Sequence, residues 1–458
     1  MQLSAIYPVI FFYRGILMVL HSVIFEDYRY KNFLPLTHTR AVFELISGFY
    51  PIWKRLARYF NILRDFKIAA RPYLYPVINY EAGFKIWNPG AEEGRFILIN
   101  GRLMGFDNGF NKLKNDIGKE EALFMSGDEV VLAVVEYETV KRLGLGAEFF
   151  LKPEYPETLK ANISRVINLD ARLIKYPWDL IDLNGSILKK DYFEVVQNYT
   201  SEDYKSSLSL GLDAGAYVLH GSDEKNDIFI GRGSRVMSGS VINAEGGPVY
   251  IGDGVTVMPG SVIMGPCYIG NGSLIKAGAT IYGETSIGEV CKVGGEVGES
   301  IIHGYSNKQH YGFLGHSYIG KWCNLGAGTC TSDLKNNYKN VRVKIEGSER
   351  VDTGRMFLGS VIGDYSRIGI GTLLNSGSVI GVMCNIFGGG MVSGNIPSFI
   401  WGGSGGYDEY DFDKAIETSS IVMLRRGKEL TPEIRELLRY VYLETSKYRK
   451  SFLSTDIN

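Results

Sequence analysis

Aliphatic side chains recur at every sixth position through most of the second half of the chain. The recurrence runs through Ile230, Val236 and Ile242, through Ile251, Val257, Ile263, Ile269, Ile275, Ile281, Ile287 and Val293, through Phe313, Ile319 and Leu325, and through Ile362, Ile368, Leu374, Ile380 and Ile386. A period of six matches neither the 3.6-residue period of an α-helix nor the two-residue alternation of a half-buried strand. It matches three short, flat strands per coil, each directing one aliphatic side chain into a narrow core. The sequence therefore predicts a left-handed parallel β-helix of hexapeptide repeats, which we assign to residues 206–400.

Two stretches, at 299–311 and 333–355, interrupt the repeats and predict loops that leave the β-helix. Because loops on a rigid scaffold often carry binding and catalytic residues, both are candidate functional segments. Each coil buries its apolar side only against its neighbours, so the ends of the stack need caps. Residues 401–458 are predicted to form the C-terminal cap, with helices at 413–426 and 432–448.

Strand and helix patterns alternate through residues 18–205. Apolar runs that predict strands occur at 19–25, 95–101 and 129–137. A segment at 40–60 has helical spacing, and an amphipathic helix is predicted at 178–197. Alternation of this kind is typical of an α/β layer with a mostly parallel sheet. We expect Met18 to be the natural start of the chain and residues 1–17 to be a non-native leader.

The overall composition limits the classes of function. Lys and Arg number 49 against 50 Asp and Glu, so the net charge of −1 provides no basic excess for binding nucleic acid. The apolar stretch at 6–20 is interrupted by Arg14 and is too short to span a membrane. It also lacks the basic flank and the cleavage site of a signal peptide. We therefore expect neither nucleic acid nor a membrane as a partner.

The cysteines indicate the redox compartment. There are five of them, an odd number, and no two form a C-x-x-C pair. This usage predicts buried thiols in a reducing environment and neither a disulfide framework nor a zinc site. A cytoplasmic protein without a metal-ligand cluster is the expectation.

Several stretches of the sequence resemble one known family. They are EDYRYKNFLPLTHTRAVFEL, INGRLM, YPWDLIDLN, KVGGEV, GYSNKQHYGFLG, CNLGAGTCTSDLKNNY, VDTGRMFLGS and IPSFIWGG. With the predicted domain order, they are similar to the bifunctional UDP-N-acetylglucosamine pyrophosphorylase/glucosamine-1-phosphate N-acetyltransferases. The resemblance is greatest to a divergent bacterial branch of these sugar nucleotidyltransferase-like proteins. It extends from Met18 to about Arg426, and the β-helix stretches are its more specific part.

The family chemistry points to a histidine. Acyl transfer from a thioester to a sugar amine needs a base for the amine proton and donors for the oxyanion. Histidine is the usual base near neutral pH. The resemblance implies that His310, three residues before Phe313, is this base. His303 and His316 match the pattern less well, and we expect them to be loop histidines bonded to backbone groups.

The resemblance also implies roles for residues in the following coils. Asn324 would orient the base or the amine, and the backbone of Ala327 would face the acyl carbonyl. With Ala327, Ser360 and Gly377 would line the channel for acetyl-CoA. Ordinary turn geometry within the β-helix is an equally good explanation for these small residues.

Sugar contacts are implied at four further positions. Lys276 stands where relatives have an Arg for the sugar phosphate, so the charge is kept without the bidentate fork. Phe313 replaces a Tyr beside the sugar. Asn337 and Tyr338 resemble a sugar-binding pair, although a short insertion makes Asp333 a competing match.

A nucleotide site is implied in the N-terminal domain, but two of its parts are missing. The relatives use a Gly-rich loop after the first strand and a metal-binding Asp after a later strand. Here the loop at 27–36 contains no Gly, and Asn100 and Arg102 stand where the Asp is expected. Because Mg²⁺ neutralises charge in phosphoryl transfer, both departures argue against this activity. The four predicted nucleotide-binding residues are Arg40, Lys54, Asn100 and Arg102. The alternative is a salt-bridged basic set in a domain that only caps the β-helix.

Replacement oxygen ligands for a metal could come from Asp179 and Asn184. An Asp at the start of a helix, however, is more often an N-cap.

These observations give one main hypothesis and two alternatives. The main one is a homotrimeric transferase that N-acetylates a sugar phosphate such as glucosamine-1-phosphate from acetyl-CoA. Formation of the UDP-sugar from UTP, with Mg²⁺, would be its second activity. The first alternative is a sugar-1-phosphate nucleotidyltransferase with a purely structural β-helix. The second is a catalytically degenerate UDP-sugar-binding protein.

Overall fold

The chain divides into two compact units. The computed structural model describes residues 10–13, 16–63, 65–108, 117, 120–197, 199–221 and 226–455. The N-terminal unit comprises Met1–Phe33, Arg40–Leu45 and Tyr50–Lys175, and the β-helix unit comprises Leu34–Thr39, Ile46–Phe49 and Tyr176–Asn458. The main division lies at Lys175 and Tyr176, whereas the sequence pattern placed the domain boundary at 205 and 206. Helix α7 (Pro177–Val196) therefore groups with the β-helix.

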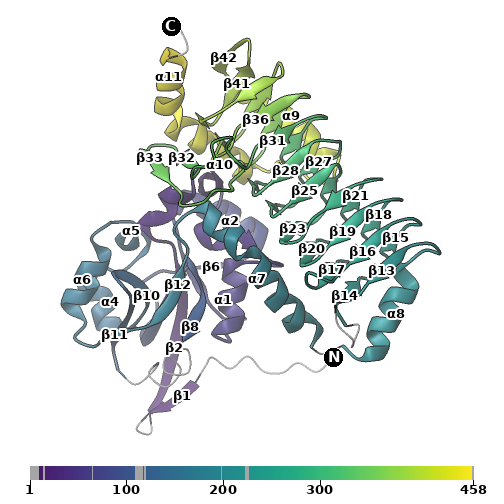
Figure 1. Ribbon diagram of the computed structural model, residues 1–458. Helices are drawn as coiled ribbons and strands as arrows, with labels where there is room; N and C mark the ends of the chain where they lie inside the picture. Colours follow the sequence, from purple (N-terminus) through teal and green to yellow (C-terminus); the bar gives the residue numbers. More distant parts are fainter. Residues whose placement is uncertain are drawn as a thin grey trace. The chain divides into compact units, whose positions relative to one another are not determined.

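A mixed β-sheet forms the core of the N-terminal unit (Figure 1). Its order is β11 (Val166–Asn168), β9 (Ala122–Ser126), β10 (Glu129–Glu136), β7 (Arg95–Asn100), β2 (Ile16–Phe25), β5 (Lys67–Ala69) and β6 (Lys85–Ile86), and β1 (Ile10–Tyr13) pairs with β2. Strands β7, β2, β5 and β6 run parallel, whereas β10 is antiparallel to both of its neighbours. The three predicted strands are confirmed, and β2 extends back to Ile16.

Short helices and one small ribbon complete this unit. The helices are η1 (Tyr28–Phe33), η3 (Val42–Glu44), α1 (Ile52–Tyr59), η4 (Pro72–Leu74), α2 (Tyr75–Ala82), α4 (Tyr137–Leu143), α5 (Ala147–Phe150) and α6 (Tyr155–Asn162). The ribbon pairs β8 (Leu103–Asn108) with β12 (Asp170–Leu173). One long helix at 40–60 was wrong, because Gly48 has a φ of +67° and Pro51 stands immediately before α1. Strands β3 (Ile46–Ser47) and β4 (Tyr50–Pro51) occupy the middle of that segment.

The β-helix unit contains three parallel faces of stacked strands (Figure 1). The first face consists of β13 (Tyr217–Leu219), β16 (Val241–Asn243), β19 (Val262–Met264), β22 (Thr280–Ile281), β25 (Glu296–Gly298) and β28 (Phe313–Gly315), followed by β31 (Cys330–Thr331), β36 (Thr372–Leu374) and β39 (Gly390–Val392). The second face consists of β14 (Ile228–Ile230), β17 (Val249–Ile251), β20 (Cys267–Ile269), β23 (Thr285–Ile287), β26 (Ile301–Ile302), β29 (Tyr318–Ile319), β34 (Val361–Ile362), β37 (Val379–Ile380) and β40 (Asn395–Ile396). The third face consists of β15 (Arg235–Val236), β18 (Thr256–Val257), β21 (Leu274–Ile275), β24 (Lys292–Val293), β27 (Asn307–Lys308), β30 (Asn324–Leu325), β35 (Arg367–Ile368), β38 (Asn385–Phe387), β41 (Ile400–Gly403) and the antiparallel β42 (Gly406–Glu409). The predicted left-handed β-helix of hexapeptide repeats is confirmed.

The stacking explains the six-residue pattern. Ile251, Ile269 and Ile287 are register partners in three successive coils, and all three are fully buried. Each coil thus contributes one aliphatic residue per face to a continuous core, which no single coil could bury alone.

Two details of the predicted repeats were wrong. Leu314, and not Phe313, is the inward residue of its strand, because Leu314 pairs with the buried Val297. The stretch at 299–311 does not leave the β-helix, since β26 and β27 continue two faces through it. The aliphatic pattern fails there because Lys308 occupies the inward position that pairs with Val293.

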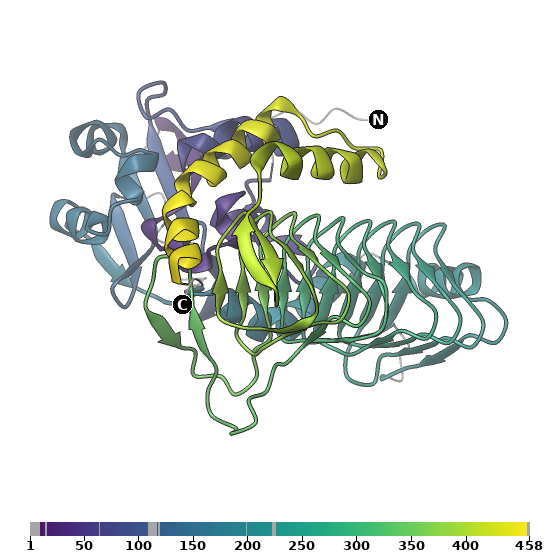
Figure 2. The same cartoon turned by 90° about the horizontal axis from the view of Figure 1, so that it is seen from above.

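The second interruption does leave the coils. It forms an antiparallel hairpin of β32 (Arg342–Lys344) and β33 (Arg350–Asp352), which projects from the β-helix (Figure 2). The C-terminal segment forms α9 (Phe412–Leu424), α10 (Pro432–Glu444) and α11 (Ser446–Thr455). Phe452 and Leu453 pack against the β-helix core, and the predicted C-terminal helices are confirmed.

The β-helix unit also holds two short segments from early in the chain. In 34–39, which includes η2 (Leu36–His38), His38 Nε2 lies 2.8 Å from Glu346 Oε1 and the Thr39 hydroxyl donates to Asp364 across 2.7 Å. In 46–49, the Gly48 N–H donates to Asn184 across 2.7 Å and the Phe49 N–H donates to Asp191 across 2.9 Å. Buried polar groups therefore fix both segments on the β-helix.

Helix α8 (Ser201–Gly211) precedes the first coil. Among the described residues, no helix is both long enough and apolar enough to cross a membrane.

Candidate functional site

His310 lies at the corner that follows β27 on the third face, and its side chain is exposed. Lys276 follows β21 at the same corner two coils earlier, and Gly294 stands between them. A Cβ atom at Gly294 would lie 2.9 Å from the Cβ of Lys276 and would collide with the backbone oxygen of Gln309. The small residue therefore lets the turns that carry Lys276 and His310 approach closely.

Lys308 supports this corner from inside. Lys308 is only 3% exposed. Its ammonium group donates one hydrogen bond of 3.0 Å to the backbone oxygen of Gly294 and one of 2.7 Å to the backbone oxygen of His310. Burial lowers the pKa of Lys308 to about 8, against the opposing influence of Cys330 and Glu296. Burying an amine among aliphatic side chains is costly. The two hydrogen bonds to backbone carbonyl oxygens offset part of that cost.

The next coil brings Asn324 and Ala327 to the same corner. Asn324 is exposed and is the register partner of Asn307 in β27. The N–H of Gly328 donates to the backbone oxygen of Tyr311 across 3.0 Å, so the turn of Ala327 lies beside the turn of His310. The structure therefore gathers the turns of Lys276, His310 and Ala327 along one edge.

A second polar group forms on the neighbouring face around Gly315. His316 Nδ1 lies 2.9 Å from Asp333 Oδ2, and its ring stacks on Phe357 with centroids 5.4 Å apart. A Cβ at Gly315 would collide with the Asp333 carboxylate, so this carboxylate lies directly over the glycine. Burial lowers the pKa of His316, but the hydrogen bond to Asp333 and the nearby Glu299 carboxylate outweigh it and raise the pKa overall. For His316 we predicted a hydrogen bond to a backbone group, whereas in the structure its partner is the Asp333 carboxylate.

His303 is the third histidine of the region. It is buried, its ring lies 5.9 Å from that of Tyr318, and it stands at the end of β26. His303 lies at the corner between β26 and β27, whereas His310 lies at the corner between β27 and β28.

The predicted sugar residues divide between two places. Phe313 is half-buried on β28, and its ring closes over Gly315 beside Asp333. Asn337 and Tyr338 lie on an exposed turn, where Tyr338 is 66% exposed with a φ of +55°. Of the two competing matches, Asp333 is the one that lies beside Phe313.

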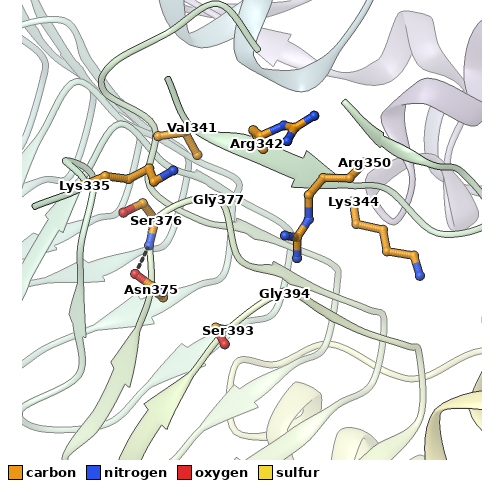
Figure 3. A pocket seen from close by; sticks show the side chains of 10 residues that line it. All are labelled: Lys335, Val341, Arg342, Lys344, Arg350, Asn375, Ser376, Gly377, Ser393 and Gly394. Carbon is orange, nitrogen blue, oxygen red and sulfur yellow. Dashed lines mark hydrogen bonds between the residues drawn. The ribbon is translucent and has the colours of Figure 1, made fainter. Parts of the chain in front are cut away.

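Two of the three predicted coenzyme A residues, Ser360 and Gly377, lie on turns that are joined through their backbone. The Gly377 N–H donates to the oxygen of Gly359 across 2.8 Å, next to Ser360. Ser360 is fully buried, and its hydroxyl has no hydrogen-bond partner among the described residues. Gly377, in contrast, lines a pocket of about 310 Å³ between the β32–β33 hairpin and two turns of the β-helix (Figure 3).

In the N-terminal unit, Asn100 and Arg102 are used internally. Arg102 is 1% exposed, and its Nε and a terminal nitrogen donate to the two carboxylate oxygens of Asp27 across 3.0 and 2.8 Å. Asn100 donates to the same carboxylate across 3.1 Å, and the Tyr155 hydroxyl donates to it across 3.3 Å. Glu129 also pairs with Arg102, at 2.9 Å. The Asp27 carboxylate is thus saturated by protein donors.

Arg40 and Lys54 lie elsewhere in this unit. Arg40 is buried, and its backbone oxygen accepts from Arg71, which forms a buried ion pair with Glu26. The ammonium of Lys54 lies 4.5 Å from the centre of the Tyr50 ring. Burial and then Arg58 lower the pKa of Lys54.

The possible replacement ligands also have other partners. Asp179 accepts from the N–H of Tyr176 at the start of α7 and pairs with Arg355 at 2.9 Å. Asn184 donates to the backbone oxygen of Glu284 across 2.7 Å. No group of three or more His, Cys, Asp or Glu side chains that could hold a metal ion occurs within the described part of the chain. The residues around Asp27 therefore do not fit Mg²⁺.

Comparisons with known proteins agree with this architecture. Residues 22–199 match the family model described as sugar nucleotidyl transferase, and residues 248–283 match the bacterial transferase hexapeptide model of six repeats. A bifunctional sugar-1-phosphate nucleotidylyltransferase/acetyltransferase of Sulfurisphaera tokodaii is 36% identical over 101 residues, which cover 22% of this chain and 25% of that protein. The bifunctional protein GlmU of Methanococcus aeolicus is 37% identical over 97 residues, covering 20% and 23%. The matched region thus spans about a quarter of the length of these relatives.

Two solved acyltransferase structures align with parts of the chain at low identity. A UDP-N-acetylglucosamine acyltransferase from Campylobacter jejuni aligns with a TM-score of 0.26 and 15% identity, over 50% of this chain and 88% of that one. A GDP-perosamine N-acetyl transferase from Caulobacter crescentus, with CoA and GDP-perosamine, aligns with a TM-score of 0.15 and 14% identity, over 41% and 59%.

Proposed function

Because the chain joins a domain of the sugar nucleotidyl transferase family to bacterial transferase hexapeptide repeats, we propose that it is an acyltransferase of amino-sugar metabolism. The reaction is N-acetylation of a sugar phosphate such as glucosamine-1-phosphate, with acetyl-CoA as donor. One observation carries the proposal: an exposed imidazole, that of His310, lies on a corner beside a lysine and a turn of small residues. The hexapeptide half therefore has an active role beyond its own packing.

In the mechanism, His310 accepts a proton from the sugar amine as the nitrogen attacks the thioester carbonyl. A tetrahedral intermediate forms, and the backbone N–H of Ala327 stabilises its oxyanion. The C–S bond then breaks, coenzyme A leaves as the thiol after taking up a proton, and the amide remains on the sugar. Lys308 holds the backbone of His310 from inside the coil and so acts as a positioning residue.

The charges at the corner are suited to a phosphorylated sugar. Lys276 supplies a cation for the phosphate, and Phe313 supplies an apolar face for the ring. Asn337 and Tyr338 lie on a turn that is open to solvent, and the turn would order on the sugar when it binds. Gly377, through the pocket it lines, is the better of the two candidates for contact with coenzyme A, because Ser360 is buried.

His316 is the competing base, and its environment favours a different role. A raised pKa leaves more of its imidazole protonated near neutral pH, in a form that cannot accept a proton. Protonated His316 instead holds Asp333 beside Phe313. There a carboxylate oxygen of Asp333 can accept a hydrogen bond from the sugar amine or from a sugar hydroxyl. Base catalysis is therefore assigned to His310.

Nucleotidyl transfer is the second candidate function, favoured by the match of residues 22–199 to the sugar nucleotidyl transferase model. Against it stands the buried Arg102–Asp27 pair, which fills the position expected for a metal-binding carboxylate. A guanidinium already neutralises Asp27, so the charge that would attract Mg²⁺ is absent there. Without a bound Mg²⁺, the N-terminal domain would bind a UDP-sugar or UTP but would not catalyse nucleotidyl transfer.

The test is release of coenzyme A from acetyl-CoA with glucosamine-1-phosphate, followed by mass spectrometry of the acetylated sugar. Wild-type protein should turn over, His310→Ala should lose about two to four decades of kcat, and His316→Gln should lose far less. Sedimentation under the same conditions should give a homotrimer. If wild type produces no acetylated sugar, the acyltransferase proposal fails. Magnesium-dependent pyrophosphate release by the same protein would then favour nucleotidyl transfer.

A further inference from the structure

Tyr311 is an exposed aromatic residue that follows the candidate base directly in the chain. It is 73% exposed, and it lies with His310 at the corner between β27 and β28. A single exposed tyrosine is ordinary on a protein surface. The contacts of its ring and of its backbone therefore decide whether Tyr311 has a role at this corner.

The ring of Tyr311 lies against the turn that contains Ala327 and Gly328. A Cβ atom at Gly328 would lie 3.2 Å from the hydroxyl oxygen of Tyr311 and 3.4 Å from two carbon atoms of its ring. Gly328 also has a φ of +72°, a conformation that favours glycine. The glycine thus leaves room for the ring, and the hydroxyl of Tyr311 lies over the residue that follows Ala327.

Two backbone contacts hold the turn of Tyr311 against the turn of Gly328. The N–H of Gly328 donates to the backbone oxygen of Tyr311 across 3.0 Å. A Cβ atom at Gly312 would collide with the backbone oxygen of Thr329, so the two turns are as close as a glycine allows. The backbone therefore fixes where Tyr311 stands, although its side chain is exposed.

The same turn presents the backbone N–H of Ala327. The N–H of Thr329 closes the turn by donating to the backbone oxygen of Gly326 across 3.2 Å. The positive φ of Gly328 at the third position is the feature of a type II turn, in which the N–H of the second residue takes no part in the closing bond. Within the described part of the chain, the N–H of Ala327 donates to no protein acceptor. It is therefore available to an oxygen of a ligand.

We propose that the hydroxyl of Tyr311 is a second donor to the oxyanion of the acetyl-transfer reaction, beside the N–H of Ala327. This inference rests on the proposed function. Negative charge develops on the thioester carbonyl oxygen when the amine attacks, and donors held in place beforehand stabilise it. A tyrosine hydroxyl can supply such a hydrogen bond and keep its own proton, so no bond at Tyr311 forms or breaks. His310 still accepts the amine proton.

A purely structural role is the alternative for Tyr311, in which its ring only covers Gly328. Phenylalanine at position 311 would keep the ring on the turn and remove the hydrogen-bond donor. Tyr311→Phe therefore separates the two roles, because packing on Gly328 is retained and stabilisation of the oxyanion is lost.

The experiment compares wild type, Tyr311→Phe and Tyr217→Phe as full-length proteins, with acetyl-CoA and glucosamine-1-phosphate. Tyr217 is the matched control because it is also an exposed tyrosine and lies in β13, on the first coil of the β-helix. Release of coenzyme A without the sugar is measured in parallel, because attack by water on the thioester passes through the same kind of oxyanion. Urea midpoints of the three proteins establish that the variants are folded.

Tyr311→Phe should lower kcat about 100- to 1000-fold with little change in the KM for acetyl-CoA, because the donor acts only on the charged intermediate. Hydrolysis of acetyl-CoA should fall by a similar factor, and Tyr217→Phe should behave as wild type. An unchanged kcat in Tyr311→Phe, or a raised KM with an unchanged kcat, would overturn the assignment and leave the proposed function standing.

A wild type that does not acetylate the sugar would refute the proposed function, and hydrolysis would then decide the role of Tyr311. Slower hydrolysis in Tyr311→Phe than in wild type would support the oxyanion donor. Equal hydrolysis in the two proteins, or none in either, would refute it.

Discussion

The ammonium of Lys308 donates a hydrogen bond of 2.7 Å to the backbone oxygen of His310. Lys308→Met should remove this bond and leave the coil intact, because replacing a buried charge with an apolar side chain of similar length is often neutral or stabilising. Since a small misplacement of a catalytic group is expensive, kcat should fall about 10- to 100-fold with little change in KM. Steady-state acetyl transfer by wild type and variant measures this.

The control for that variant is Ile386→Met, which places the same side chain in the same inward column, away from the corner. It should keep the wild-type kcat. Amide hydrogen exchange of the segment 309–312 gives a second readout, which should speed up only in Lys308→Met. Wild-type kcat and exchange in that variant would contradict a positioning role.

Lys308 should also leave a signature in the pH dependence of stability. Its pKa is lowered to about 8 in the folded chain, below the ordinary value of 10.5. Between these two values the unfolded state binds a proton that the folded state has released, so stability rises with pH in this window. Above pH 10.5 the free energy of unfolding is higher by a total on the order of 3 kcal/mol. This stabilisation is lost as the pH falls through 8. Urea unfolding at pH 7 and pH 10 should show it in wild type and not in Lys308→Met; equal pH dependence would refute it.

The sequence predicted the β-helix well because its signal is repeated in every coil, as at Ile251, Ile269 and Ile287. It failed where one chemical exception interrupted the pattern: a polar residue at 308 suggested a loop, although the strand continued through it. The Asp333–His316 pair could not be found from spacing, because the two residues belong to successive coils. The pocket depends on a hairpin whose alternating basic residues have no periodic counterpart in the chain.

Asp333→Asn should shift the titration of His316. In the folded chain the pKa of His316 is raised above 6.5, so its ion pair stabilises the protein below pH 6.5 and is lost as pH rises through the folded pKa. Removing the carboxylate takes away the hydrogen bond that is the largest raising influence, while burial and the Glu299 carboxylate remain, so the pKa of His316 should fall from its wild-type value. Proton NMR of the His316 ring resonances checks this, and a His316→Gln spectrum identifies them. A pKa of His316 that is the same in Asp333→Asn as in wild type would exclude this carboxylate as a cause.

Arg102→Met should unfold the N-terminal unit more easily, because it leaves the Asp27 carboxylate buried without its main partner. Breaking a buried pair in this way costs about 3–5 kcal/mol. Asp27→Asn in the same chain should restore part of the loss. Arg142→Met, which removes an exposed contact with Asn162 in the same unit, should cost under about 0.5 kcal/mol. Urea midpoints compare the four proteins, and equal losses at Arg102 and Arg142 would refute a structural role for the buried pair.

The β-helix unit takes residues 34–39 and 46–49 from a part of the chain far ahead of its coils. A gene fragment that begins at Tyr176 would therefore encode every coil and still lack both segments. Glu346, Asp364 and Asp191 would each lose a hydrogen-bonding partner that the fragment no longer encodes. The coils from Tyr176 onward are consequently not a complete structural unit by themselves. Transfer of the β-helix unit to another protein would have to include the segment between β2 and α1, which contains residues 34–39 and 46–49.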